Sequence, residues 1–336
     1  MKVKTHKFHG LIGKNEKMRE IYKMIRAVAS SPSTVLICGE SGTGKRMVAE
    51  ALHQTDRFRK DKIFIEVSCG ALPETLLESE LFGHIRGSFT GAIKDRAGRF
   101  EVANRGTIFL DEIDTCSPGL QVKLLRVLEQ GTYERVGDTT TLKSNVRIIA
   151  ATNQNLEQLV RIKSFREDLY WRLNVICINL PPLRERVEDV LLLVEYFLAR
   201  YNPMRIKMKN SSAIEKVSKE ALDAMLEYLW PGNVRELANC IERACILVKG
   251  NVIKLSDLPD SIFSKKYQSK STADSIDSSL KCSLRASEGD IVLNALKRFN
   301  WNCTKTAVHL GINRTTLYNK MKKCGIKKER RRYMAV

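Results

Sequence analysis

Long apolar runs are missing from this sequence. No stretch approaches the roughly 18 consecutive apolar residues that a membrane-spanning helix requires. The first ten residues, MKVKTHKFHG, also lack the apolar segment of a secretory signal peptide. Both absences argue against a helical membrane protein, so we expect a cytoplasmic protein with no membrane partner.

Closely paired cysteines are missing as well. The nine cysteines are an odd number, and no two of them form a CxxC pair. Several lie in apolar runs, such as Cys38 in TVLIC and Cys177 in VICIN. Scattered cysteines in apolar surroundings are typical of reduced, buried thiols, so the pattern argues against a disulfide framework or a zinc site.

Acidic residues are few relative to basic ones. The chain has 57 Lys and Arg against 38 Asp and Glu, which gives a net charge of +19. Residues 281–336 hold 14 of the basic residues and three acidic ones, a net +11. This balance predicts a polyanionic partner. A solvated basic tail would explain the charge alone, but not the helical pattern found in the same stretch.

What the sequence does contain is a regular alternation of strand and helix patterns. Five short apolar, β-branched runs are separated by helical patterns: TVLIC (34–38), IFIEV (63–67), TIFLD (107–111), VRIIAA (146–151) and VICIN (175–179). This alternation indicates an α/β fold with a parallel sheet covered on both faces. After Pro181-Pro182, apolar residues recur at helical spacing, which predicts a small all-helical region.

The chain of 336 residues is long enough for two or three domains. Residues 259–285 are rich in Ser, Lys and Asp, as in a flexible linker. The expected parts are an N-terminal tail (1–10), an α/β domain (11–180), a helical region (181–250), a linker (251–285), a three-helix domain (286–327) and a basic tail (328–336).

A glycine-rich motif follows the first predicted strand. GESGTGK (39–45) matches GxxxxGK and precedes a predicted helix, which is the context that this motif needs. Glycines let the backbone wrap around phosphate oxygens, while backbone N–H groups and the helix N-terminus supply positive potential. Lys45 would reach the β- and γ-phosphates; a plain structural turn is the alternative. Arg46 stands where Ser or Thr usually follows the Lys, and a guanidinium cannot bind Mg²⁺.

An acidic motif ends the third predicted strand, TIFLDE (107–112). Asp111 suits a position beside Mg²⁺, and Glu112 suits activation of an attacking water. Acids that merely start a helix are the alternative, which the phosphate motif disfavours. VRIIAATN ends the next strand with Thr152 and Asn153, and a polar side chain there would lie beside the acids.

Residues 290–326 read as three short helices. Asn302 or Thr304 suits a cap for the second helix, Gly311 the turn, and Asn313 the cap of the third. A small core is expected from Ala307, Leu310, Ile312, Leu317 and Met321. This is helix-turn-helix spacing; a dimerisation hairpin is the alternative, which the +11 charge disfavours. The residues expected to face double-stranded DNA are Arg314, Thr315, Thr316, Tyr318, Asn319 and Lys322.

Nine stretches, in order, resemble the bacterial enhancer-binding activators, AAA+ ATPases that work with the alternative sigma factor sigma-54. They read LIGKNEKM, GESGTGK, ESELFGHIRGSFTGA, AGRFEVANRGTIFLDEI, QVKLLRVLEQGTYERVGD, VRIIAATN, FREDLYWRLNV, LPPLRER and WPGNVREL. The resemblance implies an AAA+ P-loop domain, an all-α lid at 181–250 and a Fis-type helix-turn-helix. It also implies a hexameric ring that hydrolyses ATP with Mg²⁺ and remodels the sigma-54 RNA polymerase holoenzyme from upstream DNA.

The resemblance also assigns roles to individual residues. Arg166 and Arg172 resemble arginine fingers that reach a neighbour's γ-phosphate, and Arg235 resembles the lid's sensor arginine. The alternative is that Arg166 and Arg172 simply lie on a solvent-exposed face of a helix. The expected catalytic residues are Glu112, Asp111, Asn153, Arg166 and Arg172, with Asp111 also on Mg²⁺. The expected nucleotide-binding residues are Ile12, Gly13, Gly39, Glu40, Ser41, Gly42, Thr43, Gly44, Lys45, Arg46 and Arg235.

The stretch GSFTGA resembles the family's GAFTGA loop, which grips sigma-54. Phe89 is expected to be an exposed apolar knob, because such a ring makes sense if a partner covers it. A Phe tucked under its own hairpin is the alternative. ATP would lift the loop on glycine hinges. The expected sigma-factor contacts are Gly87, Ser88, Phe89, Thr90, Gly91 and Ala92.

Three residues depart from the family pattern. Ser88 stands for Ala, Ser68 stands where many relatives carry an Asn that senses the catalytic Glu, and Arg46 replaces an acidic residue. A second function class is therefore a DNA-binding regulator with an impaired ATPase, acting independently of sigma-54. A third class, a replication or helicase-loading AAA+ protein, would have no use for the GSFTGA loop. No sensory domain precedes the ATPase region, so we expect separate control or a piece of a longer activator.

Overall fold

The computed structural model describes residues 7–209, 212–248, 250–262, 292, 295–296, 299, 301–310 and 312–323. The chain divides into two units, residues 1–267 and 268–336, and each is described by itself. The expected basic tail at 328–336 and the expected linker from residue 263 onward lie outside the described residues. Within the described residues, no helix is both long and apolar enough to cross a membrane.

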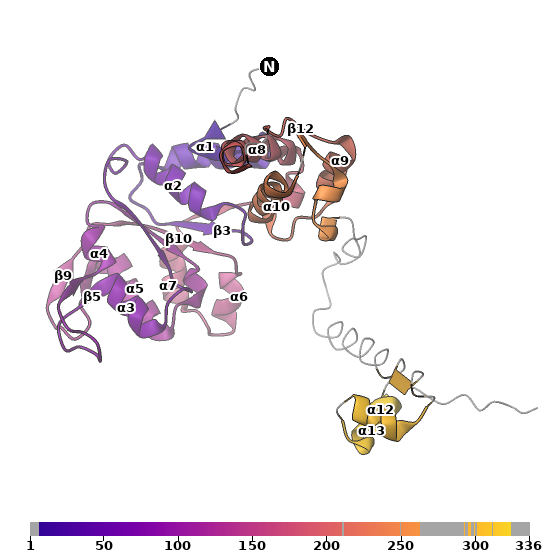
Figure 1. Ribbon diagram of the computed structural model, residues 1–336. Coiled ribbons are helices and arrows are strands. Elements are labelled where there is room, and N and C mark those ends of the chain that lie inside the picture. The colour runs from indigo at the N-terminus through magenta and orange to yellow at the C-terminus, as the bar shows by residue number, and fades with distance from the viewer. Residues whose placement is uncertain are drawn as a thin grey trace, which may run out of the picture. The chain divides into compact units, whose positions relative to one another are not determined.

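A five-stranded parallel sheet organises the first unit (Figure 1). Its order is β11 (Ile176–Asn179), β3 (Val35–Cys38), β10 (Arg147–Thr152), β7 (Thr107–Asp111) and β4 (Phe64–Ser68). Every neighbouring pair is parallel. All five strands lie within one residue of the apolar runs that predicted them, so the α/β fold class is confirmed.

Helices cover both faces of this sheet, as Figure 1 shows. On β3, Leu36 points to one face while Val35 and Ile37 point to the other, since successive side chains alternate along a strand. The Ile37 face packs against α1 (Glu16–Val28) and α2 (Lys45–Thr55). The Leu36 face packs against α3 (Glu74–Phe82), α5 (Pro118–Gln130), α6 (Leu156–Arg161) and α7 (Glu167–Leu173). The sheet therefore has two apolar cores.

Local signals fix where several helices begin and end. The Ser117 side chain accepts a hydrogen bond from the N–H of Leu120, Pro118 occupies the first turn, and Gly131 ends α5 in the left-handed region. Asn155 caps α6 in the same way through Gln158. Such caps set the loops that follow the strands, and those loops carry the functional side chains.

Short two-stranded sheets extend this unit. The antiparallel pair β5 (Gly83–His84) and β6 (Arg96–Ala97) brackets residues 85–95, which include GSFTGA, and leads to α4 (Arg99–Val102). The hairpin β8 (Thr132–Glu134) and β9 (Thr141–Lys143) lies beside it, because the N–H of Ile85 donates to the carbonyl of Val136. At the N-terminus, β1 (Lys7–Phe8) pairs with β2 (Leu11–Ile12). The expected tail at 1–10 thus includes a strand.

The lid consists of α8 (Glu188–Lys209), α9 (Lys219–Glu227) and α10 (Asn233–Leu247) around the buried Trp230. It is helical as expected, with one addition: β12 (Lys216–Val217) pairs in parallel with β13 (Val252–Ile253). Residues 251–262 fall inside the expected linker, yet Ile253 and Leu258 are buried in the lid core. The linker expectation is therefore wrong for this stretch, which includes η3 (Leu255–Asp257) and η4 (Asp260–Ile262). Apolar residues spaced along an otherwise polar segment were its only sequence signal.

The second unit contains α12 (Cys303–His309) and α13 (Arg314–Lys323). The side chain of Asn302 accepts from the N–H of Lys305, and that of Asn313 accepts from the N–H of Thr316. Asn302, rather than Thr304, is thus the cap of the second helix. Gly311 lies outside the described residues. The small core contains the five residues expected for it: Ala307, Leu310, Ile312, Leu317 and Met321. Val292 and Leu296 also belong to it.

Candidate functional site

The glycine-rich loop connects β3 to α2, as its strand–loop–helix context predicts. Gly44 has φ +108° and stands at the N-terminal end of α2. The ammonium of Lys45, the first residue of that helix, donates to the carbonyls of Gly39 (2.8 Å) and Glu40 (3.2 Å). Burial lowers the pKa of Lys45. A cation held by weakly basic carbonyls is ready to exchange them for phosphate oxygens.

The two acids lie at the carboxyl end of the neighbouring strand β7. Burial raises the pKa of Asp111, and the positive charge of Lys45 opposes this shift. Glu112 follows with φ +57° and ψ +45°, a left-handed conformation that is strained for any residue with a Cβ. The side chain of Glu112 is therefore aimed by an unusual backbone conformation, and such strain is common at functional sites.

Ser68 at the end of β4 reaches Glu112 despite its short side chain. Its hydroxyl donates to the Glu112 carboxylate at 3.1 Å. The same carboxylate lies against the backbone of Gly70, where any Cβ would collide with it. The Ser68 hydroxyl therefore reaches the Glu112 carboxylate, although Ser is shorter than the Asn that the resemblance leads us to expect at this position.

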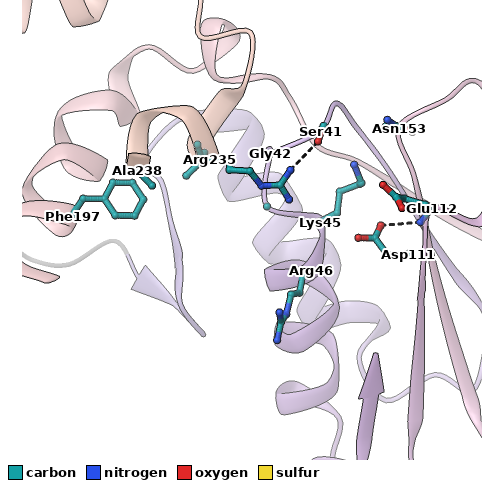
Figure 2. Close-up of a pocket in the computed structure, with 12 residues that line it drawn as sticks. Ser41, Gly42, Lys45, Arg46, Asp111, Glu112, Asn153, Phe197, Arg235 and Ala238 are labelled. Atoms are coloured by element: carbon teal, nitrogen blue, oxygen red, sulfur yellow. Dashed lines mark hydrogen bonds between the residues drawn. The ribbon is translucent and has the colours of Figure 1, made fainter. Parts of the chain in front are cut away.

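The polar end of β10 completes this side of the site. The hydroxyl of Thr152 donates to Asp114 at 2.6 Å, while the side chain of Asn153 faces the space above Asp111 and Glu112 (Figure 2). The Thr152 hydroxyl thus binds the 3₁₀ turn η1 (Ile113–Thr115) through Asp114, whereas Asn153 faces the site.

These residues surround a cleft of about 250 Å³ between the sheet and the lid (Figure 2). It is lined by Ser41, Gly42, Gly44, Lys45, Arg46, Asp111, Glu112, Asn153, Phe197, Val234, Arg235 and Ala238. Nine of these belong to the sites predicted from the sequence. The lid residues Phe197, Val234 and Ala238 were missed; the only signal was that Val234 and Ala238 flank Arg235 on one face of α10.

Arg46 points along α2 and away from the acids, as Figure 2 shows. Its guanidinium forms ion pairs with Glu50 (3.1 Å) and Glu66 (3.0 Å). Arg46 therefore borders the cleft without occupying the position in which a Ser or Thr hydroxyl would approach a metal ion.

The lid touches the glycine-rich loop directly. The guanidinium of Arg235 donates to the Ser41 hydroxyl at 3.0 Å, and the N–H groups of Val234 and Arg235 both reach the carbonyl of Gly42. A Cβ at Gly42 would fall on the carbonyl oxygen of Gly232. The N-terminus of α10 is thus fastened to the loop through backbone groups.

Two predicted nucleotide-binding residues do not line the cleft. Ile12 packs against the lid core. Gly13 lies against Asp189, whose carboxylate accepts from the N–H groups of Lys14 (2.6 Å) and Asn15 (3.1 Å) at the start of α1. Their role in nucleotide binding stays a prediction.

Arg166 and Arg172 also lie away from this cleft. Arg166 forms a two-pronged ion pair with Asp168, and Arg172 pairs with Glu129 at 3.2 Å. Both side chains are largely exposed. They do not contact their own chain's site.

The loop 87–92 is closed by its own backbone. The N–H of Gly87 donates to the carbonyl of Ala92, and Ala92 is buried. Phe89 is half-buried, because its ring meets the edge of the His84 ring at a centroid distance of 5.0 Å. The expectation of an exposed Phe89 is wrong for this conformation. Thr90 in the loop is exposed, and so is the apolar side chain of Ile93 next to it, at 82%.

The predicted DNA-facing residues lie on α13. Arg314 and Thr315 are exposed, and the Arg314 guanidinium lies 5.7 Å from the centre of the Tyr318 ring. The hydroxyl of Thr316 donates to Asn313 and so takes part in the helix cap. The side chains of Asn319 and Lys322 lie outside the described residues.

Comparison with known proteins identifies the parts of the chain. The Sigma-54 interaction domain matches residues 11–179, the AAA+ ATPase lid domain residues 184–275, and the Fis family of bacterial regulatory proteins residues 283–323.

Individual relatives match nearly the whole chain. Nitrogen fixation protein AnfA of Azotobacter vinelandii is 44% identical over 316 residues, covering 94% of this chain and 57% of AnfA. Transcriptional regulatory protein ZraR of Klebsiella oxytoca is 45% identical over 312 residues, covering 93% and 68%. The chain thus spans little more than half the length of AnfA.

Solved structures of NtrX from Brucella abortus share the fold. The complex with ADP has a TM-score of 0.68 at 32% identity, and the complex with ATP has 0.67 at 31%. Each comparison covers 94% of this chain and 69% of the NtrX chain. With its phosphate loop, its paired acids, its lid and its C-terminal helix-turn-helix, the chain belongs to the family of sigma-54 interaction AAA+ proteins with a Fis-type DNA-binding region.

Proposed function

We propose that this chain is an ATP-hydrolysing transcriptional activator. It binds upstream double-stranded DNA and remodels the sigma-54 RNA polymerase holoenzyme so that the promoter opens. The observation that carries the proposal is the hydrogen bond from Ser68 to Glu112 in the cleft that also holds Lys45 and Asp111. The NtrX complexes with ADP and ATP support a nucleotide in this cleft.

The reaction splits ATP into ADP and phosphate by the attack of water on the γ-phosphoryl group. Glu112 orients that water and accepts its proton, and Ser68 keeps the carboxylate in place. Lys45 leaves the loop carbonyls and neutralises the β- and γ-phosphate oxygens. Asn153 faces the same space and orients the water from the adjacent strand.

Asp111 is the residue that would hold Mg²⁺. The described residues contain no cluster of three or more His, Cys, Asp or Glu side chains that could bind a metal ion by itself. One carboxylate beside a phosphate loop nevertheless fits Mg²⁺, which uses one or two carboxylates together with substrate phosphates. When bound, the ion would neutralise phosphate charge as the γ-phosphoryl group leaves.

A neighbouring subunit completes the site. Arg166 and Arg172 are exposed and lie outside their own chain's cleft, so we infer that they act on the nucleotide of an adjacent protomer in a hexameric ring. Each would exchange its present carboxylate partner, Asp168 or Glu129, for phosphate oxygens. Arg235 already contacts the phosphate loop and would report lid position.

The loop 87–92 contacts sigma-54 and transmits to it the conformational change driven by ATP hydrolysis. Phe89 rests on His84 in this conformation, so contact with the sigma factor requires the ring to leave that pocket. Gly87 and Gly91, with φ +82° and +105°, permit this movement. Upstream DNA would be held by the exposed α13 residues Arg314, Thr315 and Tyr318, with Thr316, Asn319 and Lys322 beside them on the same helix. The alternative, a regulator with an impaired ATPase, loses support from the positions of Ser68 and Arg46.

Transcription in vitro from a sigma-54-dependent promoter tests the function. Phe89→Ala should keep ATP hydrolysis within about twofold while open-complex formation falls at least tenfold, because the ring makes no contact with the cleft. Glu112→Gln should lose both activities while still binding nucleotide. Normal transcription by Phe89→Ala, or ATP-independent transcription by the parent chain, would reject the proposal.

A further inference from the structure

Glu40 is an unusual residue to find in an anion-binding loop. Its backbone carbonyl faces inward and accepts from Lys45 Nζ and from the Thr43 hydroxyl (2.8 Å). Its carboxylate lies within the same loop that binds phosphate, and a negative charge there opposes an incoming triphosphate. Something must offset that charge if the loop is to bind nucleotide well.

Arg184 provides the offset. Its two terminal nitrogens donate to the two Glu40 oxygens at 2.6 and 2.8 Å, the two-pronged geometry that is strongest for this pair. Arg184 lies in η2 (Leu183–Glu185), the short turn that joins β11 to the first lid helix. The hydrogen bonds from Arg184 hold the pKa of Glu40 below its ordinary value, so both partners are charged near neutral pH.

Asn233 fastens this pair to the lid. It is fully buried and has φ +52°, an unfavourable conformation for a residue with a Cβ. Its side-chain N–H₂ donates to Glu40 (3.1 Å) and to the Ser41 carbonyl (3.0 Å), while its side-chain oxygen accepts from the N–H of Leu183 (2.7 Å). The Asn233 amide therefore connects the phosphate loop, α10 and η2 (Leu183–Glu185), which we call the hinge turn because it joins the sheet to the lid.

We propose that Arg184 and Glu40 form a charge-neutral latch in which Arg184 cancels the carboxylate charge beside the nucleotide phosphates and Asn233 holds the pair against the lid. These are positioning residues, since neither charged side chain lines the cleft. The latch makes nucleotide affinity depend on the position of the hinge turn. The inference rests on the proposed function only in taking a nucleoside triphosphate as the ligand.

Binding of a fluorescent ATP analogue to the full chain tests the latch. Arg184→Ala should raise the Kd about fivefold at 50 mM salt, and the effect should shrink at 0.5 M salt because both side chains are about 40% exposed and therefore screened. Glu40→Gln combined with Arg184→Ala should bring the Kd back to within about twofold of the parent. Glu40→Gln alone should bind as tightly as the parent or tighter, because Arg184 then adds an uncompensated positive charge.

Lys17→Ala is the matched control. Lys17 forms an exposed ion pair with Glu185, the next residue of the same turn, at 2.7 Å. Its loss removes one positive charge from the hinge region without touching the phosphate loop, so the Kd should stay within about 1.5-fold of the parent.

Three outcomes would overturn the latch: an unchanged Kd in Arg184→Ala, a double variant as weak as Arg184→Ala, or weaker binding by Glu40→Gln alone. The second would mean that Arg184 acts through local structure rather than charge. If Arg184→Ala fails to unfold cooperatively, Glu40→Gln still decides. Because binding is measured without turnover, a parent chain that binds nucleotide but fails to hydrolyse it would reject the proposed function and leave the latch standing.

Discussion

Gly42 and Gly87 have nearly the same φ, +79° and +82°, in two very different surroundings. At Gly42, a Cβ would fall on the carbonyl oxygen of Gly232 in the lid. At Gly87, at the base of the loop that carries Phe89, a Cβ would meet nothing within 4 Å. One glycine permits close approach and the other permits only an unusual backbone conformation.

This contrast describes the two working regions of the first unit. The phosphate loop is held by contacts from several separate segments, among them the Arg184, Asn233 and Arg235 side chains. The loop 87–92 is held at its ends by backbone hydrogen bonds and near its tip by the Phe89–His84 contact. The phosphate loop thus has contacts from several separate segments, whereas the loop 87–92 has fewer, as the proposed movement of that loop requires.

The largest expected effect comes from Gly42→Ala. The added methyl group cannot fit without moving the lid backbone, so we expect nucleotide binding to weaken by about 10- to 100-fold, the equivalent of 1–3 kcal/mol of overpacking. Titration with a fluorescent ATP analogue measures this. Gly250→Ala is the control, since a Cβ there meets open space. Equal affinities for the two variants would show that the lid does not fasten the loop.

His84→Ala tests the contact that holds Phe89 in the loop 87–92. Removing the imidazole takes away the surface on which Phe89 rests, as well as the hydrogen bond between His84 and Ser79. Affinity for sigma-54 without nucleotide should rise by about three- to tenfold, the effect of a contact worth near 1 kcal/mol, while ATP hydrolysis stays within twofold. Ser79→Ala, which removes only the hydrogen bond, should give a smaller rise. A loss of sigma-54 affinity in His84→Ala would contradict a docked ring.

Asp111→Asn is expected to stabilise the fold, which would confirm that the fixed region is built for chemistry rather than stability. Burial raises the pKa of Asp111, so the folded state penalises its carboxylate, and that penalty grows as the pH rises through the folded-state value. The variant should therefore unfold about 2–4 °C higher than the parent at pH 8, and the gain should vanish as the pH falls toward 3.8, the ordinary Asp value.

Asp138→Asn should change the unfolding temperature in the opposite direction when measured over the same range of pH. Hydrogen bonds from Thr140 lower the pKa of Asp138, so its charged form contributes stability above the ordinary Asp value. Its removal should lower the unfolding temperature slightly at pH 8, or leave it unchanged. A matching stabilisation in both variants would point to net charge rather than to the burial of Asp111.

The sequence predicted the fold and most of the residues that line the cleft, because local chemistry fixes both. Short apolar, β-branched runs located all five strands. Asp111 is the last residue of β7, and Lys45, Glu112 and Asn153 follow the ends of strands. Contacts that depend on tertiary distance were not predictable in this way. Nothing in the sequence shows that the Ser68 hydroxyl contacts Glu112, or how closely that carboxylate lies to Gly70.

The remaining contacts could not be predicted because they join residues that are far apart in the sequence. Glu40 meets Arg184 across 144 residues and Asn233 across 193, and no local pattern links them. Exposure of Phe89 was predicted from the resemblance of GSFTGA to a loop that grips a partner, but the ring of His84, on the strand before the loop, covers part of it. Residues 251–262 read as linker because their few apolar side chains gain meaning only against the lid core.

The smallest effect on nucleotide binding is expected from Gly87→Ala. Its size, set against that of Gly42→Ala, makes the comparison of the two loops quantitative. With no atom within 4 Å of the new methyl group, the cost is only that of a left-handed backbone in a residue with a Cβ, about 1–2 kcal/mol. Thermal unfolding should shift by a few degrees or less, and nucleotide affinity should equal that of the parent, in contrast to Gly42→Ala. ATP-dependent binding of sigma-54 should rise about threefold, because the strain destabilises the docked conformation, in which the φ of Gly87 is positive. If Gly87→Ala instead weakened nucleotide binding as strongly as Gly42→Ala, the loop and the phosphate site would be a single rigid body, and the movement that the proposed function requires would have no structural basis.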